Sequence, residues 1–127
     1  MMIFIVGRIL LGGYFIYSGI NHFLEHKGMV GYSKSKGVPM AEIAVPATGI
    51  MLVFGGLAIV LGTFVSIGMW ILIIFLVITS FAMHQFWKIK DPMAQMPERI
   101  NFLKNMALVG ALLMLLALPL PWVYAIL

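Results

Sequence analysis

The chain has 127 residues, of which 63% are hydrophobic and 9% are charged, with a net charge of +4 and a mean hydropathy of +1.11. A soluble domain carries roughly 25% charged residues, so the composition excludes an ordinary soluble protein and indicates one integral membrane domain over residues 1–127. The absence of cysteine excludes disulfides, thiol chemistry and cysteine-ligated metal or iron–sulfur sites within this chain.

Four apolar runs are long enough to cross a membrane, since a span needs about 20 residues that rise about 1.5 Å each. They cover residues 3–23, 43–61, 64–83 and 100–118. The connection between the second and third runs is very short and carries no charge. We therefore expect an all-α protein in the lipid bilayer, an antiparallel transmembrane four-helix bundle made of two helical hairpins.

The basic residues indicate the orientation of these spans. Of the 8 Lys and Arg residues, all except Arg8 lie in the loop 22–42 or in the segment 84–104. The positive-inside pattern then predicts a multi-pass protein of the cell membrane, with both long loops in the cytoplasm and both termini outside. This distribution of basic residues explains the net positive charge, so we expect no nucleic-acid partner.

Arg8 lies inside the first apolar run, where a charge costs about 2.5–3.5 kcal/mol at the membrane centre on insertion scales. It either snorkels to the outer interface or faces the bundle interior, where it holds an anion, a carbonyl or a helix end. Two glycines on the same helical face favour the interior. Small residues line contacts between membrane helices, so we expect helix contacts at Gly12, Gly19, Gly49, Gly56 and Gly110.

A stripe of polar side chains follows another face of the first run, at Tyr14, Tyr17, Ser18 and Asn21. Such a stripe faces protein or water rather than lipid, and it serves either hydrogen bonds between helices or a ligand, for which Tyr17 and Asn21 are candidates. His22 and His26 follow at the i, i+4 spacing of helical metal ligands. They lack a third ligand nearby, so we expect interfacial side chains and no metal site.

His84 ends the third run and is the candidate catalytic residue. Imidazole exchanges protons near neutral pH, so His84 is either an interface histidine bonded to a loop carbonyl or a proton donor or acceptor toward a ligand from the membrane. This residue and the polar face of the fourth run should lie near the same membrane surface, where polar side chains need partners.

That polar face consists of Asn101, Lys104 and Asn105, at the i, i+3, i+4 spacing of one helical surface. A lysine early in a helix opposes the macrodipole, so it does not serve helix propensity. Lys104 either snorkels to anionic lipid head groups or pairs with Glu98, Glu42 or a ligand oxygen. All three residues of this face are candidates for binding the ligand.

Several short motifs occur in order over most of the chain: Arg8-Ile-Leu-Leu-Gly12, Tyr17-Ser18-Gly19, Gly37-Val38-Pro39, Gly55-Gly56, Leu61-Gly62, His84 with Phe86, Phe102-Leu-Lys104-Asn105 and Leu108-Val-Gly110. Together they resemble the DoxX family of small four-helix membrane proteins. The resemblance implies a link to quinones, because the family's name derives from quinone-linked sulfur oxidation and related subunits belong to a thiosulfate:quinone oxidoreductase. Members often carry a glutamate just before the paired glycines, and Leu52 stands there in this chain. If that acid pairs with a cation in relatives, Arg8 or Lys104 lacks the partner here.

The leading hypothesis is a membrane protein that binds a lipophilic ligand such as a quinone between its helices, near the cytoplasmic face, in a redox-linked complex and without a covalently bound cofactor. His84 would donate a hydrogen bond or a proton to a head-group oxygen, Lys104 and Asn105 would hold the same group, and Arg8 would order the opposite end. A redox partner protein would have to supply the electrons, so the resemblance leaves open whether the chain is an oxidoreductase subunit.

The alternative is a non-enzymatic assembly or scaffold subunit for partner proteins. A small transporter is disfavoured, because four short spans enclose little volume unless the chain forms a homo-oligomer.

Overall fold

The computed structural model describes residues 2–125, and every element in this part of the chain is helical. The elements are α1 (Met2–Leu24), α2 (His26–Ser35), α3 (Ala41–Leu61), α4 (Val65–Met83), the short 3-10 helix η1 (Phe86–Lys88) and α5 (Pro92–Leu116). Four of them, α1, α3, α4 and α5, belong to segments long and apolar enough to cross a membrane. The expected transmembrane helical bundle is therefore confirmed.

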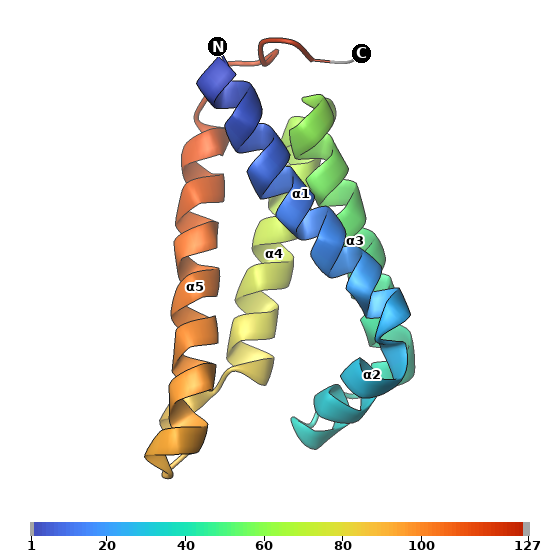
Figure 1. Cartoon of the computed structure of the whole chain (residues 1–127), viewed down its shortest axis with the longest axis vertical. Helices are drawn as coiled ribbons and strands as arrows, with labels where there is room; N and C mark the ends of the chain where they lie inside the picture. The colour runs from blue at the N-terminus through green and yellow to red at the C-terminus, as the bar shows by residue number, and fades with distance from the viewer. Residues whose placement is uncertain (1, 126–127) are drawn as a thin grey trace.

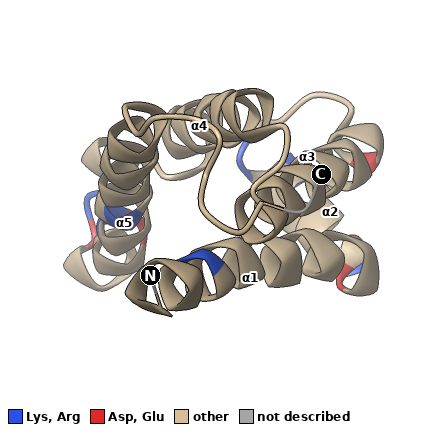
Figure 2. Cartoon of the chain, turned by 90° about the horizontal axis from the view of Figure 1, so that it is seen from above, with Lys and Arg blue, Asp and Glu red and all other residues tan. Residues whose placement is uncertain are grey.

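The two long connections lie at one end of the molecule and both termini lie at the other (Figure 1). α1 packs against α3, α3 against α4, and α4 against α5. Seen from the end that carries the termini, these four helices follow one another round the molecule, and most of the ribbon carries no charge (Figure 2). Leu52 lies in the core with Phe15, Met69, Leu72 and Leu112, so apolar packing fills the position at which the DoxX resemblance would predict a glutamate.

Glycine builds the contact between α1 and α3. A Cβ at Gly12 would lie 2.6 Å from the carbonyl oxygen of Gly56, and a Cβ at Gly19 would lie 2.7 Å from that of Gly49. The two backbones therefore touch, as expected for small residues between membrane helices. The same expectation for Gly110 is wrong, because no described atom outside its own helix turn lies within 4 Å of a Cβ built there.

The two long connections contain more helix than the sequence pattern indicates. The loop 22–42 includes α2, and α5 begins at Pro92 rather than near Ile100. The side chain of Asp91 accepts a hydrogen bond from the backbone N–H of Met93, and proline occupies the first turn. Both features favour a helix start. The early start places Glu98 inside α5.

The connection between α3 and α4 is the tight hairpin expected from its length. Gly62 ends α3 with φ of +71°, and its N–H donates to the carbonyl of Ala58. This left-handed backbone conformation favours glycine, which has no Cβ to clash. The side chain of Arg8 also lies here, because a Cβ on Gly62 would meet its guanidinium at 2.8 Å.

Candidate functional site

A cavity of about 370 Å³ lies between α1, α2, α3 and α4, at the end of the bundle away from the termini. Its apolar wall includes Met29, Val45, Phe75, Ile78, Ala82 and Met83. Its polar groups come from His22, Tyr32, Ser33, Thr48, Thr79 and His84. A mostly apolar wall with a few polar groups, at a volume within about 300–1,000 Å³, is typical of small-molecule sites. We call it the His84 cavity.

Glu98 is the centre of a polar cluster beside this cavity. The residue is 6% exposed, and Lys36 Nζ lies 2.9 Å from its Oε2. The hydroxyl of Tyr32 donates to its Oε1 at 2.9 Å, and His84 Nδ1 lies 3.5 Å from Oε2. A buried carboxylate is stable only with such partners. The cluster therefore joins α2 and the residue after it, the end of α4 and the start of α5.

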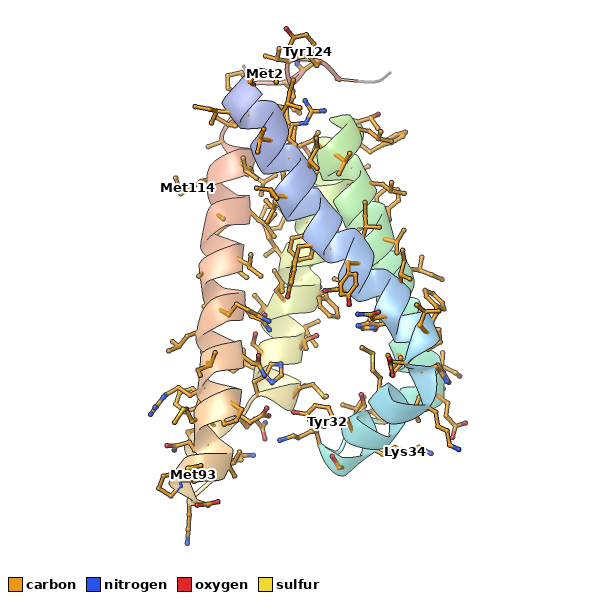
Figure 3. The ribbon with its side chains drawn as sticks, in the orientation of Figure 1. Met2, Tyr32, Lys34, Met93, Met114 and Tyr124 are labelled. Atoms are coloured by element: carbon orange, nitrogen blue, oxygen red, sulfur yellow. The ribbon has the colours of Figure 1, made fainter. Side chains whose placement is uncertain are left out.

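Tyr32 is held in its protonated form by this cluster. Burial, followed by the hydrogen bond and the charge of Glu98, raises the pKa of Tyr32 to about 12. A phenolate beside a carboxylate would place two like charges together, which disfavours ionisation. Tyr32 therefore stays a hydrogen-bond donor at neutral pH. It lies with Lys34 at the end of the molecule opposite Met2 and Tyr124 (Figure 3).

His22 is held on the other side of the cavity by α3. Its Nδ1 lies 2.9 Å from the carbonyl oxygen of Val45 and 3.0 Å from Oγ1 of Thr48. The Thr48 hydroxyl in turn donates to the carbonyl of Ala44 at 2.7 Å. His26, in contrast, lies outside the cavity, with its Nε2 3.3 Å from the carbonyl oxygen of Glu42.

Of the predicted site residues, His84 lines this cavity and the others do not. The candidates outside it are Arg8, Tyr17, Asn21, Asn101, Lys104 and Asn105. Asn105 is buried at 6% exposure, on the same side of α5 as Glu98. Lys104 Nζ lies 5.8 Å from the centre of the Tyr14 ring. Roles of these residues in ligand binding stay predictions.

The structure adds detail to two of the sequence-based expectations. Of the polar stripe of α1, Tyr17 is 66% exposed and Tyr14 is 40% exposed, while Ser18 and Asn21 are half-buried. The buried face is instead the one with Arg8, Gly12, Phe15 and Gly19, because close contact with α3 requires the glycines. The two acids suggested for Lys104 have other partners, since Glu98 pairs with Lys36 and Glu42 pairs with Lys34 at 2.8 Å.

Arg8 orders the end of the bundle that carries the termini. It is 5% exposed, and its Nε donates to the carbonyl of Ile59 at 3.1 Å. Its other nitrogens donate to Val60 at 2.8 Å and to the carbonyls of Val123 and Tyr124 in the tail. A cation at the C-terminal end of α3 also complements the helix dipole. Arg8 thus faces the interior and holds a helix end, one of the two alternatives from the sequence.

The sequence pattern missed the importance of Glu98, Tyr32 and Lys36, and it predicted only an interfacial side chain at His22. One signal for Glu98 was present, because the buried residues of α5 recur every seventh position, at Glu98, Asn105 and Leu112. That spacing is typical of one packed helix face. It becomes visible only when Asp91-Pro92 is taken as the helix start.

The chain is similar in sequence to known membrane proteins. The model of the DoxX family matches residues 3–85. The chain belongs to the DoxX family. It is also 31% identical to the inner membrane protein YphA of Escherichia coli (strain K12), over 114 residues that cover 90% of this chain and 81% of the relative. No solved structure matches the chain.

DoxX membership and four apolar helices identify an integral membrane protein. The part that matches the DoxX model includes His22, Thr48 and His84, so most of the cavity wall lies within it. Glu98 lies in α5, after the matched residues.

Proposed function

We propose that this DoxX protein binds a lipophilic molecule with an oxygen-bearing ring, of the quinone and hydroquinone class, in the His84 cavity. The supporting observation is the cavity itself, in which polar side chains from four helices face a mostly apolar volume of about 370 Å³. Polar groups at the end of a membrane span are functional candidates because lipid cannot satisfy them.

In this proposal His84 contacts the head-group oxygen and exchanges a proton with it. His84 lines the cavity, and its Nδ1 lies 3.5 Å from Oε2 of Glu98, which is not part of the cavity wall. A carboxylate in this position favours the tautomer whose Nδ1 carries the hydrogen, which leaves Nε2 to exchange a proton with the guest. The chain has no cysteine with which to hold a redox cluster, so electrons would pass to or from a partner protein in a redox-linked complex.

Native mass spectrometry of gently extracted protein tests the binding. We expect a bound mass of the quinone class on the wild type, and an affinity about 5- to 140-fold lower for His84→Ala, because an unpaired head-group oxygen in an apolar site costs about 1–3 kcal/mol. His26→Ala is the matched control, since His26 lies outside the cavity.

A wild type that carries only bilayer phospholipid would contradict the proposal. Stable co-purification with a soluble protein and no bound small molecule would favour the assembly-subunit alternative. Equal loss of the ligand from His26→Ala and His84→Ala would show that the effect does not come from the cavity.

A further inference from the structure

Both histidines of the cavity direct Nδ1 toward a protein acceptor. His22 Nδ1 lies 2.9 Å from the carbonyl oxygen of Val45, which can only accept, so this nitrogen carries the hydrogen. Thr48 Oγ1, 3.0 Å from the same nitrogen, has two backbone carbonyls as acceptors for its own hydrogen, Ala44 at 2.7 Å and Val45 at 2.9 Å. The hydroxyl therefore does not require a lone pair on Nδ1.

His84 Nδ1 also faces a protein oxygen, but it makes no hydrogen bond there. Its Nδ1 is buried, and the acceptor it faces is Oε2 of Glu98 at 3.5 Å, which is long for a hydrogen bond. Lys36 and Tyr32 both hold this carboxylate, at 2.9 Å each, which favours its ionised, acceptor-only form. An unprotonated Nδ1 would place a lone pair against a negative charge. The hydrogen of the neutral imidazole therefore belongs on Nδ1.

A neutral imidazole has one N–H, so a hydrogen on Nδ1 leaves Nε2 as an acceptor. Within residues 2–125 no protein group hydrogen-bonds to Nε2 of His22 or of His84, and both residues line the cavity. Each imidazole therefore has an acceptor nitrogen available to a guest. The hydroxyl hydrogens of Tyr32 and Thr48 are already donated to protein oxygens. The remaining hydroxyls of the wall, on Ser33 and Thr79, can rotate to donate or to accept.

The geometry points to a guest that donates hydrogen bonds, namely a lipophilic ring with hydroxyl groups such as a hydroquinone, in preference to a quinone whose carbonyls only accept. This inference deepens the proposed function and rests on it. It also adds His22 to the site, as a second acceptor on the α1 side that pairs with His84 on the α4 side. Val45 and Glu98 become positioning residues, because they determine which ring nitrogen faces the guest.

Three ring probes with the same decyl chain test the inference: the hydroquinone, the quinone and the hydroquinone dimethyl ether. Their binding to the wild-type protein in lipid nanodiscs is measured by isothermal titration calorimetry. The hydroquinone is measured under anaerobic reducing conditions, which keep it reduced. We expect the hydroquinone to bind about tenfold or more tightly than either of the others, because each lost donor leaves an imidazole nitrogen unpaired. The quinone controls for size, since it is no larger than the hydroquinone.

The variants locate the effect. His22→Ala should reduce the preference for the hydroquinone over the quinone, and His26→Ala should leave it unchanged. Equal binding of the three probes, or tighter binding of the quinone, would overturn the inference and leave the proposed function standing. Failure of all three to bind would overturn both. Because the comparison of probes is made on the wild type, it does not depend on the folding of any variant.

Discussion

Lys36 Nζ lies 2.9 Å from Oε2 of Glu98, and this ion pair joins the segment after α2 to the start of α5. The carboxylate side chain is 8% exposed and the ammonium side chain is 26% exposed. Their positions are 62 residues apart by number (98 − 36), so the pair fastens the two long connections to each other. The same carboxylate faces His84, so the cluster also holds one wall of the candidate site.

We expect Lys36→Met to lower the free energy of unfolding by about 1–3 kcal/mol, because it leaves the Glu98 carboxylate buried without its cation. Lys34→Met is the matched control. Its pair with Glu42 is exposed, with side-chain exposures of 57% and 69%, so its loss should cost at most about 1 kcal/mol. Denaturant titration in detergent measures both. Equal effects would show that the Lys36–Glu98 pair does not fasten the connections.

Tyr32 should ionise at about pH 12, since burial and Glu98 raise its pKa to about that value. The chain has 4 tyrosines, and the difference in ultraviolet absorbance between the wild type and Tyr32→Phe isolates the signal of Tyr32 from that of the others. We expect its phenolate signal to rise with a midpoint near pH 12. A midpoint near the ordinary value of about 10 would mean that the hydroxyl does not contact Glu98.

The same shift predicts how stability depends on pH. Because the folded state raises the pKa of an acid, the stabilisation is complete below the ordinary value of about 10 and is lost as pH rises through about 12. The stability difference between the wild type and Tyr32→Phe should therefore shrink between these two pH values. A difference that grows over this range would have the wrong sign.

Arg8→Lys should lower the thermal unfolding temperature, although it conserves the charge. The planar guanidinium donates at once to the end of α3 and to the C-terminal tail, and an ammonium cannot reproduce that fork. Arg99→Lys, at an exposed position, is the matched control and should have little effect. The prediction fails if the two substitutions lower the unfolding temperature equally.

Gly56→Ala should separate α1 from α3, because its Cβ would lie 2.6 Å from the backbone oxygen of Gly12. We expect a loss of stability of about 1–3 kcal/mol from overpacking. Gly110→Ala places the same methyl group where no described atom outside its own helix turn lies within 4 Å, and it should be neutral or stabilising by up to about 1 kcal/mol. Denaturant titration of both variants compares them directly.

The orientation predicted from the basic residues is tested by a single cysteine. Because the chain has none, Lys34→Cys creates one unique label site on α2. An impermeant thiol reagent should leave it unlabelled in intact cells and label it after lysis, because the positive-inside pattern puts this end in the cytoplasm. Labelling in intact cells would reverse the orientation.

Hydropathy and glycine spacing were sufficient to predict four apolar helices and the glycines that line the α1–α3 contact, because lipid imposes long apolar helices and close contacts need small residues. The cluster around Glu98 was not predictable in the same way. Tyr32 and Lys36 lie on or next to a short helix with two glycines, Gly28 and Gly31, and glycine has low helix propensity. Their approach to Glu98 depends on how two distant connections fold together, which no local pattern encodes.

For His84, the sequence predicted the residue but not its partner. Its position at the end of a span made it a candidate, and the structure places it at a cavity wall. The partners expected for it on α5 were Asn101, Lys104 and Asn105, but the group that faces it is Glu98. The difference follows from the start of α5 at Pro92, which extends the packed face of that helix toward the connections.

Photoaffinity labelling tests the central claim most directly. A decyl azidoquinone is bound to the protein in native membranes, illuminated, and located by peptide mass spectrometry. We expect label on half-buried cavity residues of α2 and α4, such as Met29, Thr79 and Met83, and loss of that label when excess decylquinone competes. Label confined to outward-facing residues such as Leu113 and Met114, unaffected by the competitor, would contradict it.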